Sequence, residues 1–259
     1  MRHERRDHRE KIYIYGKHAL TEALTHTPHV VSKVFLSSEA NQDKDLRELL
    51  RSRSISPAML KTPRDASDMV GEDTAHQGVI AIADPSKILR DFNEFFATLT
   101  PDENTALVLL DELTDPHNVG AIIRSAAAFG AVGVLIPPHN QAPITGSVVK
   151  ASAGMAFRIP IVAIGNINQT ILKLKDEGFR AYALAMEGAK DVTKVKFDAP
   201  SVFVIGNEGR GIRQKTLEHS DVALRIPMNP RCESLNASVS AAVVLYQWST
   251  QHPGALRRS

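Results

Sequence analysis

Five polar residues between positions 118 and 236 of this 259-residue chain have types and spacings that suit a reaction site. They occur in three groups, each after an apolar run: Asn118 with Arg124, Glu208 alone, and Ser234 with Asn236. Each run is typical of a strand, and the loop after it leads into a helical pattern. Because open α/β sheets hold their ligands beyond the carboxyl ends of the strands, the pattern predicts that the three loops meet in one site.

The chemistry open to these side chains is the handling of negative charge on oxygen. Arg124 carries a guanidinium, which keeps its proton at neutral pH and is therefore a poor general base. It is better suited to hold a phosphate and to stabilise developing negative charge. Structural roles remain open: a surface or interface salt bridge for Arg124, a helix N-cap for Asn118, and stabilisation of a helix start for Glu208.

Three glycines follow the second apolar run within six residues, at Gly206, Gly209 and Gly211. Such a loop can approach a ligand closely and offer it backbone N–H groups, although a tight turn between strand and helix would use the same residues. The chain contains neither G-x-G-x-x-G nor G-x-x-x-x-G-K-[ST], which argues against a dinucleotide oxidoreductase and a P-loop NTPase. His117 and His139 lack a second ligand at metal spacing, so we expect no metal site.

The elements that must position these residues alternate regularly from residue 105 onward. Near-continuous apolar strands separated by helical stretches predict a parallel sheet covered on both faces. The expected strands are 106–110, 133–136, 159–164, 181–185, 202–205 and 223–226. The expected helices are 118–129, 145–155, 167–177, 211–219 and 235–249, with Ser234 as the N-cap of the last.

Together the three stretches resemble, in order and spacing, the three motifs of the SpoU (TrmH-like, SPOUT) family of RNA ribose 2′-O-methyltransferases. They read LDELTDPHNVGAIIRSAAAFGA (110–131), FVIGNEGRGI (203–212) and RIPMNPRCESLNASVSAAVVLYQW (225–248). The resemblance implies S-adenosylmethionine as cofactor and a C-terminal parallel-sheet methyltransferase domain with a deep trefoil knot. Cys232, where the family often has an apolar residue, is interpreted as a non-catalytic loop residue.

The resemblance also assigns roles to individual residues. The residues that match the family's cofactor contacts are Gly206, Ile226 and Leu235. The residues that match its motif residues on the reaction side are Asn118, Arg124, Glu208, Ser234 and Asn236. In the family, the knotted region is where two subunits meet, so we expect a homodimer that packs partly through the helix at 235–249.

The first part of the chain predicts a smaller domain. Residues 12–83 alternate helical patterns, at 16–25 and 43–53, with strand patterns, at 32–36 and 77–83. They resemble the family's N-terminal substrate-binding domain, which has an L30e-like α/β fold. Gly16-Lys17-His18, at a helix start, could receive a phosphate or simply begin the helix.

Two further segments complete the expected organisation. Residues 1–11 are predicted to be a basic flexible tail, either solvated or touching RNA phosphate. Residues 84–104 are predicted to be a linker with one short helix, followed by the methyltransferase domain at 105–259. A net charge of +2 does not by itself indicate a nucleic-acid-binding protein. One cysteine and no long apolar run predict a cytoplasmic protein without a membrane segment.

The expected function is transfer of a methyl group from S-adenosylmethionine to a ribose 2′-OH in RNA. The two-domain length and the MNPR-ESLN context are most similar to family members that act on a guanosine of 23S rRNA. Two alternatives remain: a tRNA ribose 2′-O-methyltransferase, and a catalytically silent RNA-binding protein of the same fold. The motif residues argue against the silent alternative.

Overall fold

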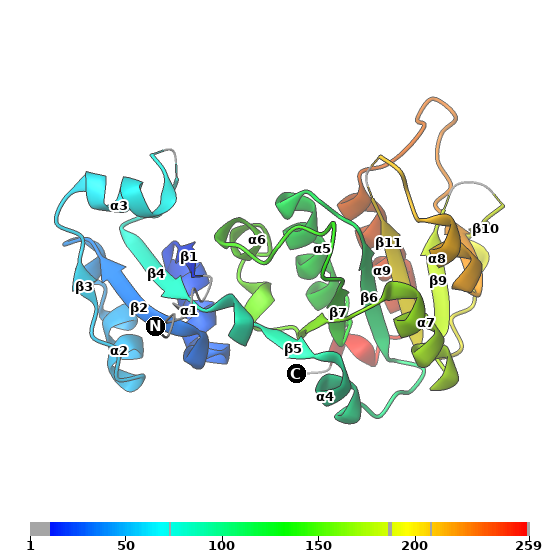
Figure 1. Ribbon diagram of the computed structural model, residues 1–259, viewed down its shortest axis with the longest axis horizontal. Helices are drawn as coiled ribbons and strands as arrows, with labels where there is room; N and C mark the ends of the chain where they lie inside the picture. Colours follow the sequence, from blue (N-terminus) through cyan, green and yellow to red (C-terminus); the bar gives the residue numbers. More distant parts are fainter. Residues whose placement is uncertain (1–10, 73, 186–187, 208, 258–259) are drawn as a thin grey trace, which may run out of the picture. The chain divides into compact units, whose positions relative to one another are not determined.

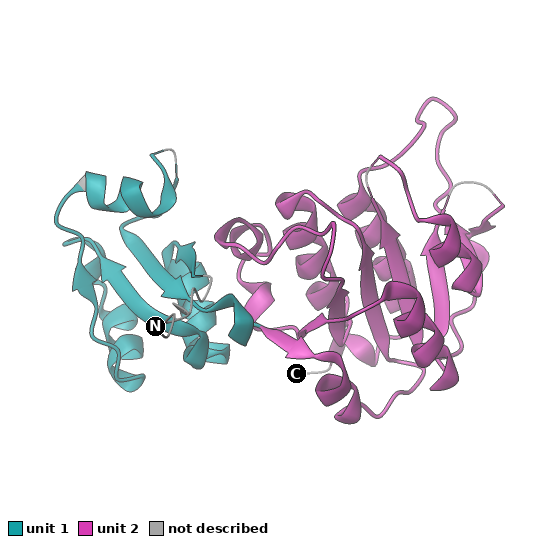
Figure 2. Cartoon of the chain, in the orientation of Figure 1, with its two compact units in different colours: residues 1–88 teal, residues 89–259 magenta. Residues whose placement is uncertain are grey.

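The computed structural model describes residues 11–72, 74–185, 188–207 and 209–257, and the chain forms two compact units. Unit 1 comprises residues 1–88 and unit 2 comprises residues 89–259 (Figures 1 and 2). The expected basic tail, residues 1–11, lies outside the described residues except for Lys11. No helix in the described part of the chain is long and apolar enough to cross a membrane.

Unit 1 is built on a four-stranded mixed sheet in the order β1-β4-β2-β3. Its strands are β1 (Ile12–Tyr15), β2 (Val31–Leu36), β3 (Ala58–Met59) and β4 (Val79–Ala83). Its helices are α1 (Lys17–His26), α2 (Lys44–Ser52) and α3 (Pro63–Val70). The expected helices and strands are present, and the sheet also contains β1 and β3, which were not predicted. Helix α3 was missed as well, although its capping box, formed by Thr62 and Asp65, is readable in the sequence.

Unit 2 is built on an eight-stranded sheet in the order β10-β12-β9-β11-β6-β7-β8-β5, and every pairing in it is parallel. The strands are β5 (Leu89–Asp91), β6 (Ala106–Asp111), β7 (Gly133–Ile136), β8 (Ile161–Ala163), β9 (Arg180–Leu184), β10 (Lys190–Asp191), β11 (Ser201–Gly206) and β12 (Val222–Arg225). The helices are α4 (Phe92–Ala97), α5 (Pro116–Ala128), α6 (Gly146–Ala151), α7 (Ile167–Asp176), α8 (Gln214–His219) and α9 (Ala237–Gln251). The predicted parallel α/β sheet is therefore confirmed.

Helices cover both faces of this sheet, as β11 illustrates. Side chains alternate between the two faces of a strand, and Val202 and Val204 join a buried cluster with α4 and α7. Phe203 lies on the opposite face, where its ring is 6.4 Å from that of Trp248 in α9. Helix α5 packs beside α9 and α6 (Figure 1). Burial on both faces explains why the central strands read as continuous apolar runs.

The expected linker at 84–104 differs from what the structure shows, because residues 89–104 belong to unit 2. Strand β5 pairs with β8 at the edge of the large sheet. Asp91 then caps α4, accepting hydrogen bonds from the N–H groups of residues 93 and 94. Phe92 and Phe95 are buried in the core cluster beneath α7. The C-terminal unit therefore begins at Leu89 and not at residue 105.

Candidate active site

The centre of the large sheet has the topology that creates a ligand site. Strands β6 and β11 are neighbours, and Asp111 at the end of β6 lies opposite Gly206 at the end of β11. The chain continues from β6 to β7 on one side, and from β11 to β12, beyond β9, on the other. Such a switch point opens a crevice outside the carboxyl ends of parallel strands. The loops that follow β6 and β11, which carry the first and second motifs, therefore begin side by side at this edge of the sheet.

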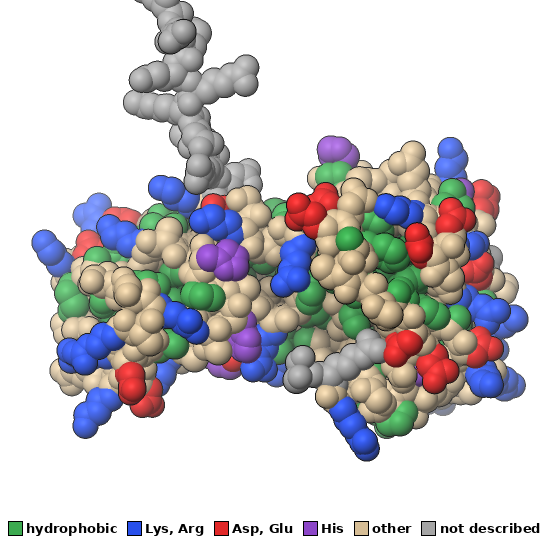
Figure 3. Space-filling model, turned by 90° about the horizontal axis from the view of Figure 1, so that it is seen from below, with side chains coloured by type: hydrophobic (Ala, Val, Ile, Leu, Met, Phe, Trp, Pro, Cys, Tyr) green, Lys and Arg blue, Asp and Glu red, His purple; other side chains and the backbone are tan. Residues whose placement is uncertain are grey.

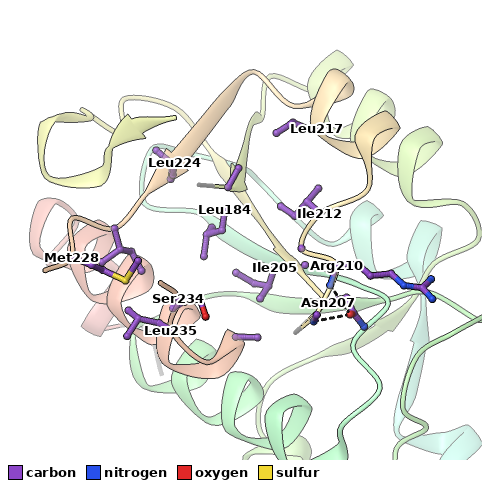
Figure 4. A pocket seen from close by; sticks show the side chains of 17 residues that line it. Leu184, Ile205, Asn207, Arg210, Ile212, Leu217, Leu224, Met228, Ser234 and Leu235 are labelled. Atoms are coloured by element: carbon purple, nitrogen blue, oxygen red, sulfur yellow. Dashed lines mark hydrogen bonds between the residues drawn. The ribbon is translucent and has the colours of Figure 1, made fainter. Parts of the chain in front are cut away.

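A cavity of about 500 Å³ lies at the ends of β9, β11 and β12. Met228 and Leu235 lie on one side of this cavity and Ile212 lies on the other (Figure 4). The size of the cavity and its mainly apolar lining suit a small organic ligand. The described residues that line it are Leu184, Ala185, Ile205, Gly206, Asn207, Gly209, Arg210, Gly211, Ile212, Leu217, Leu224, Ile226, Met228, Ser234, Leu235, Ala237 and Ser240. All three residues expected to contact the cofactor, Gly206, Ile226 and Leu235, are among them.

The glycine loop after β11 is closed on itself. Asn207 and Gly211 exchange backbone hydrogen bonds of 3.0 and 2.9 Å. The Asn207 side chain also accepts from the N–H groups of Gly209, at 3.0 Å, and Arg210, at 3.2 Å. A Cβ atom on Gly206 would lie within 2.6 Å of the Gly211 backbone. Glu208, the residue of the second motif that is expected on the reaction side, lies outside the described residues.

Asn118 and Asn236, from the first and third motifs, are joined by a hydrogen bond. The Asn236 Nδ2 group donates to Oδ1 of Asn118 over 2.9 Å. Asn118 is buried, 7% exposed, in the first turn of α5. It is not the N-cap: Asp115 caps α5 by accepting from the N–H of His117 at 2.8 Å. The N-cap alternative for Asn118 is therefore wrong, and its amide faces the start of α9.

The N-cap of α9 was also placed incorrectly by sequence. Asn236, not Ser234, is the cap, because its Oδ1 accepts from the N–H groups of Ser238 and Val239. Ser234 lies two residues earlier, exposed on the loop, and lines the cavity. Asn236 thus has two structural contacts, one to its own helix and one to α5.

Arg124 is set apart from the cavity. It is exposed on α5, six residues beyond Asn118, or about 9 Å along the helix axis. It makes no hydrogen bond or ion pair with any other described residue. The structure therefore groups Gly206, Ile226, Leu235 and Ser234 around one cavity, while Arg124 remains available to a group from outside the chain.

At the candidate phosphate site at the start of α1, Lys17 already makes an ion pair within unit 1. The Lys17 ammonium lies 2.5 Å from Oδ2 of Asp43, which caps α2. This hydrogen bond raises the pKa of Lys17 and lowers that of Asp43. A phosphate at this helix start would have to compete with the Asp43 carboxylate for Lys17.

Two sequence profiles of known families match the chain. One, described as RNA 2′-O ribose methyltransferase substrate binding, matches residues 13–89. The other, described as the SpoU rRNA Methylase family, matches residues 105–246, more than half of the chain. The chain belongs to the SpoU rRNA methylase family. The resemblance of the three SpoU motifs is confirmed by this match.

Curated SpoU relatives match almost the whole length of the chain. A protein of Haemophilus influenzae named 23S rRNA (guanosine-2′-O-)-methyltransferase RlmB is 34% identical over 244 residues, 93% of this chain and 98% of its own length. A Staphylococcus aureus protein named putative TrmH family tRNA/rRNA methyltransferase is 34% identical over 240 residues, 92% of this chain and 95% of its own.

Solved methyltransferase structures share the fold. The methyltransferase AviRb from Streptomyces viridochromogenes, solved in complex with the cofactor AdoMet, superimposes with a TM-score of 0.78 at 24% identity, over 94% of this chain and 91% of its own. An rRNA methyltransferase from Sinorhizobium meliloti gives a TM-score of 0.78 at 22% identity, over 95% of this chain and 89% of its own. At this identity the likeness establishes the two-domain fold.

Proposed function

We propose that the protein transfers a methyl group from S-adenosylmethionine to a ribose 2′-OH in RNA, with a guanosine of 23S rRNA as the expected substrate. The observation that carries the proposal is that the loops of the second and third motifs line one cavity beside the switch point of a SpoU sheet, while the hydrogen bond between Asn236 and Asn118 joins the first motif to the third. The name of the H. influenzae relative supports the guanosine substrate. The name of the S. aureus relative includes tRNA, so tRNA is the second candidate substrate.

The cavity fits S-adenosylmethionine, which supplies a methyl group activated by a positively charged sulfur. Its volume lies within the range typical of cofactor sites, about 300–1,000 Å³. The apolar side chains of Ile226 and Leu235 suit the adenine and the hydrocarbon part of the cofactor. The loop after Gly206 brings backbone polar groups to the same cavity. We assign Gly206, Ile226 and Leu235 to cofactor binding.

The reaction side is assigned to α5 and to the start of α9. A ribose hydroxyl is a weak nucleophile, so the site must orient it and tolerate negative charge on its oxygen. The exposed guanidinium of Arg124 suits the phosphate next to that ribose and the developing charge. The joined amides of Asn118 and Asn236 hold α5 against the third motif. Glu208 and Ser234 complete the proposed set.

RNA binding is assigned to both units. Unit 1 matches the substrate-binding profile, and Figure 3 shows Lys and Arg side chains on both units, interspersed with Asp and Glu. Such a surface is not uniformly basic. It suits a protein that recognises RNA by its shape and its 2′-OH groups as well as by its phosphate charge. An rRNA substrate would place the reaction in the cytoplasm.

A homodimer is part of the proposal, supported by the outer face of α9. Val239 is 46% exposed and Tyr246 is 58% exposed, and both lie on the stripe that Ala242 and Val243 continue. The ring of Phe129, at the end of α5, packs against Tyr246. An apolar stripe along one helix can pair with its own copy about a twofold axis. We also propose the family's trefoil knot for the chain between β11 and α9.

A transfer assay tests the proposal. The purified protein is given S-adenosylmethionine with a labelled methyl group, together with rRNA or tRNA from cells that lack the protein. We expect label on a guanosine ribose of 23S rRNA. Label on tRNA alone would favour the second candidate substrate. Tight RNA binding without any transfer would identify a silent RNA-binding protein and overturn the proposal.

Unit 2 alone is expected to bind S-adenosylmethionine, provided that its first strand is retained. A fragment of residues 89–259 keeps β5, Phe92 and Phe95, whereas a fragment of residues 105–259 loses them. Removing a buried phenyl ring costs about 3–5 kcal/mol of stability. Thermal unfolding and calorimetric titration should show cofactor binding by the longer fragment and a much lower unfolding temperature for the shorter one. Failure of a folded 89–259 fragment to bind would assign part of the cofactor site to unit 1.

Asn236→Asp is expected to separate the two contacts of Asn236. Aspartate keeps the acceptor for the N-cap and caps about as well as asparagine, but it places an oxygen against Oδ1 of Asn118. We expect nearly normal thermal stability and a loss of transfer of about tenfold or more. Asn236→Ala, which removes both contacts, should also lower stability by about 1 kcal/mol. Wild-type transfer by Asn236→Asp would show that the link between the asparagines is dispensable.

A further inference from the structure

A charged cluster outside the cavity joins the end of β6 to the end of the glycine loop. Arg213, the last residue before α8, lies with Nε 2.8 Å from Oδ1 of Asp111 and Nη1 2.8 Å from Oε1 of Glu112. Its backbone N–H also donates to Oδ2 of Asp111 over 3.3 Å. The Asp111 side chain is completely buried, whereas that of Arg213 is 46% exposed.

The Asp111 contact is a charge pair more than a directed hydrogen bond. Its Oδ1 receives no hydrogen bond of good geometry, although Nε of Arg213 is only 2.8 Å away. The short distance still matters, because a buried carboxylate without a nearby cation is strongly destabilising. Arg213 is the cation that the described residues place beside Asp111.

The same strand end holds the beginning of the loop. Asn207 Nδ2 donates to the backbone oxygen of Glu112 over 2.8 Å. Glu112 has φ +62°, a conformation that non-glycine residues seldom adopt without a structural or functional reason. In this conformation its backbone contacts Asn207, while its carboxylate contacts Arg213 and, at 3.1 Å, Nδ2 of Asn140.

The loop is therefore attached to the end of β6 through Asn207 and through Arg213. The described residues between these attachments, Gly209 to Ile212, line the cavity. Strand β6 leads, through Asp115, into α5 with its reaction-side residues. A change at Arg213 would consequently alter the cavity wall without removing any residue that lines it.

We propose that Arg213 is a positioning residue for the cofactor, which holds the glycine loop against Asp111 and Glu112 in its binding conformation. The inference rests on the proposed function, since it takes S-adenosylmethionine as the ligand of the cavity. A purely structural ion pair would change the stability of the protein but not the affinity of the folded protein. A positioning residue changes the affinity for the cofactor while the rate at saturating cofactor is largely retained.

The test compares full-length Arg213→Gln, Arg213→Lys and Lys215→Gln proteins with the wild type. Lys215 is an exposed cation on the neighbouring helix α8 and lies outside the cavity lining, so it is a matched control for loss of charge. We expect Arg213→Gln to raise the dissociation constant for S-adenosylmethionine and its KM about tenfold or more. The rate at saturating cofactor and the KM for RNA should change much less. Lysine keeps one charge contact but not the fork, so Arg213→Lys should be intermediate.

The outcomes separate the inference from the proposed function. A folded Arg213→Gln protein with wild-type cofactor affinity overturns the inference, while transfer by the wild type still supports the function. A wild-type protein that binds no S-adenosylmethionine overturns both. If Arg213→Gln does not fold, Glu112→Gln removes only one carboxylate and leaves Asp111 paired. We then expect Glu112→Gln to raise the same KM severalfold, and an unchanged KM would overturn the inference.

Discussion

Gly206→Ala is expected to weaken S-adenosylmethionine binding by the full-length protein about a hundredfold or more. The added Cβ would lie 2.5 Å from the carbonyl carbon of Gly211 and 2.6 Å from N of Ile212. Both are backbone atoms, so no side chain can rotate to relieve the contact, and the loop must open. Because that loop forms one wall of the cavity, we expect affinity to fall about a hundredfold or more, a cost typical of overpacking a closely packed site.

Gly209→Ala is the matched control in the same loop. Among the described residues, a Cβ on Gly209 would meet Oδ1 of Asn207 alone, at an ordinary contact distance of 3.7 Å. Its effect on affinity should therefore be far smaller than that of Gly206→Ala. Calorimetric titration of both proteins, with thermal unfolding to confirm that each is folded, makes the comparison. Similar affinities for wild type and Gly206→Ala would show that this loop does not shape the cofactor site.

The loops that carry this site could be predicted from sequence because each follows a buried strand. Strands β6, β7 and β11 were located to within a residue or so, since apolar runs buried on both faces have a strong signal. The segment 84–104 was instead predicted to be a linker with one short helix, so α4 has a counterpart in the prediction and β5 has none. A three-residue strand has little periodicity of its own, and the pairing of Leu89–Asp91 with β8 depends on tertiary contacts.

The details of the site depended on choices that local sequence does not make. Serine and asparagine both cap helices, so Ser234, Asn236 and Ser238 were all candidate caps for α9. The residue that caps it, Asn236, also donates a hydrogen bond to Asn118, which lies far away in the sequence. The ion pair between Asp111 and Arg213 likewise joins the first motif to the residue that follows the second motif. The local sequence around Asp111 and Arg213 does not predict this contact. The two residues come together only because β6 and β11 are neighbours in the sheet.

Arg124→Ala is expected to abolish methyl transfer while leaving cofactor affinity nearly unchanged. Arg124 lies outside the cavity lining and makes no hydrogen bond or ion pair within the described part of the chain. Its loss should therefore spare the cofactor site and remove stabilisation of phosphate and developing charge, at a cost of about a hundredfold or more in rate. Arg124→Lys keeps the charge but loses the planar fork, so a severe loss in that protein would favour a geometric role. Transfer at the wild-type rate by Arg124→Ala would remove Arg124 from the mechanism.

Whether Arg124 serves its own subunit or its partner can be decided by mixing subunits. In the proposed dimer, α9 pairs with its copy, and Arg124 on α5 reaches the neighbouring site. Arg124→Ala and Gly206→Ala proteins should each be inactive alone, and heterodimers should regain activity. If Arg124 acts on the partner, one site of the heterodimer combines an intact cofactor loop with an intact Arg124. If it acts within its own subunit, each site keeps one lesion.

The mixing experiment first requires light scattering to establish a dimer and differently tagged subunits to verify exchange. A monomeric, active protein would show that the exposed stripe at Val239 and Tyr246 has another role. Verified heterodimers without recovered transfer would place Arg124 in the site of its own subunit. Recovery of up to half of the wild-type activity per heterodimer is the expected result, because only one of the two sites then lacks both substitutions. Such recovery would show that each active site is completed by the partner subunit, since neither subunit could complete its site alone.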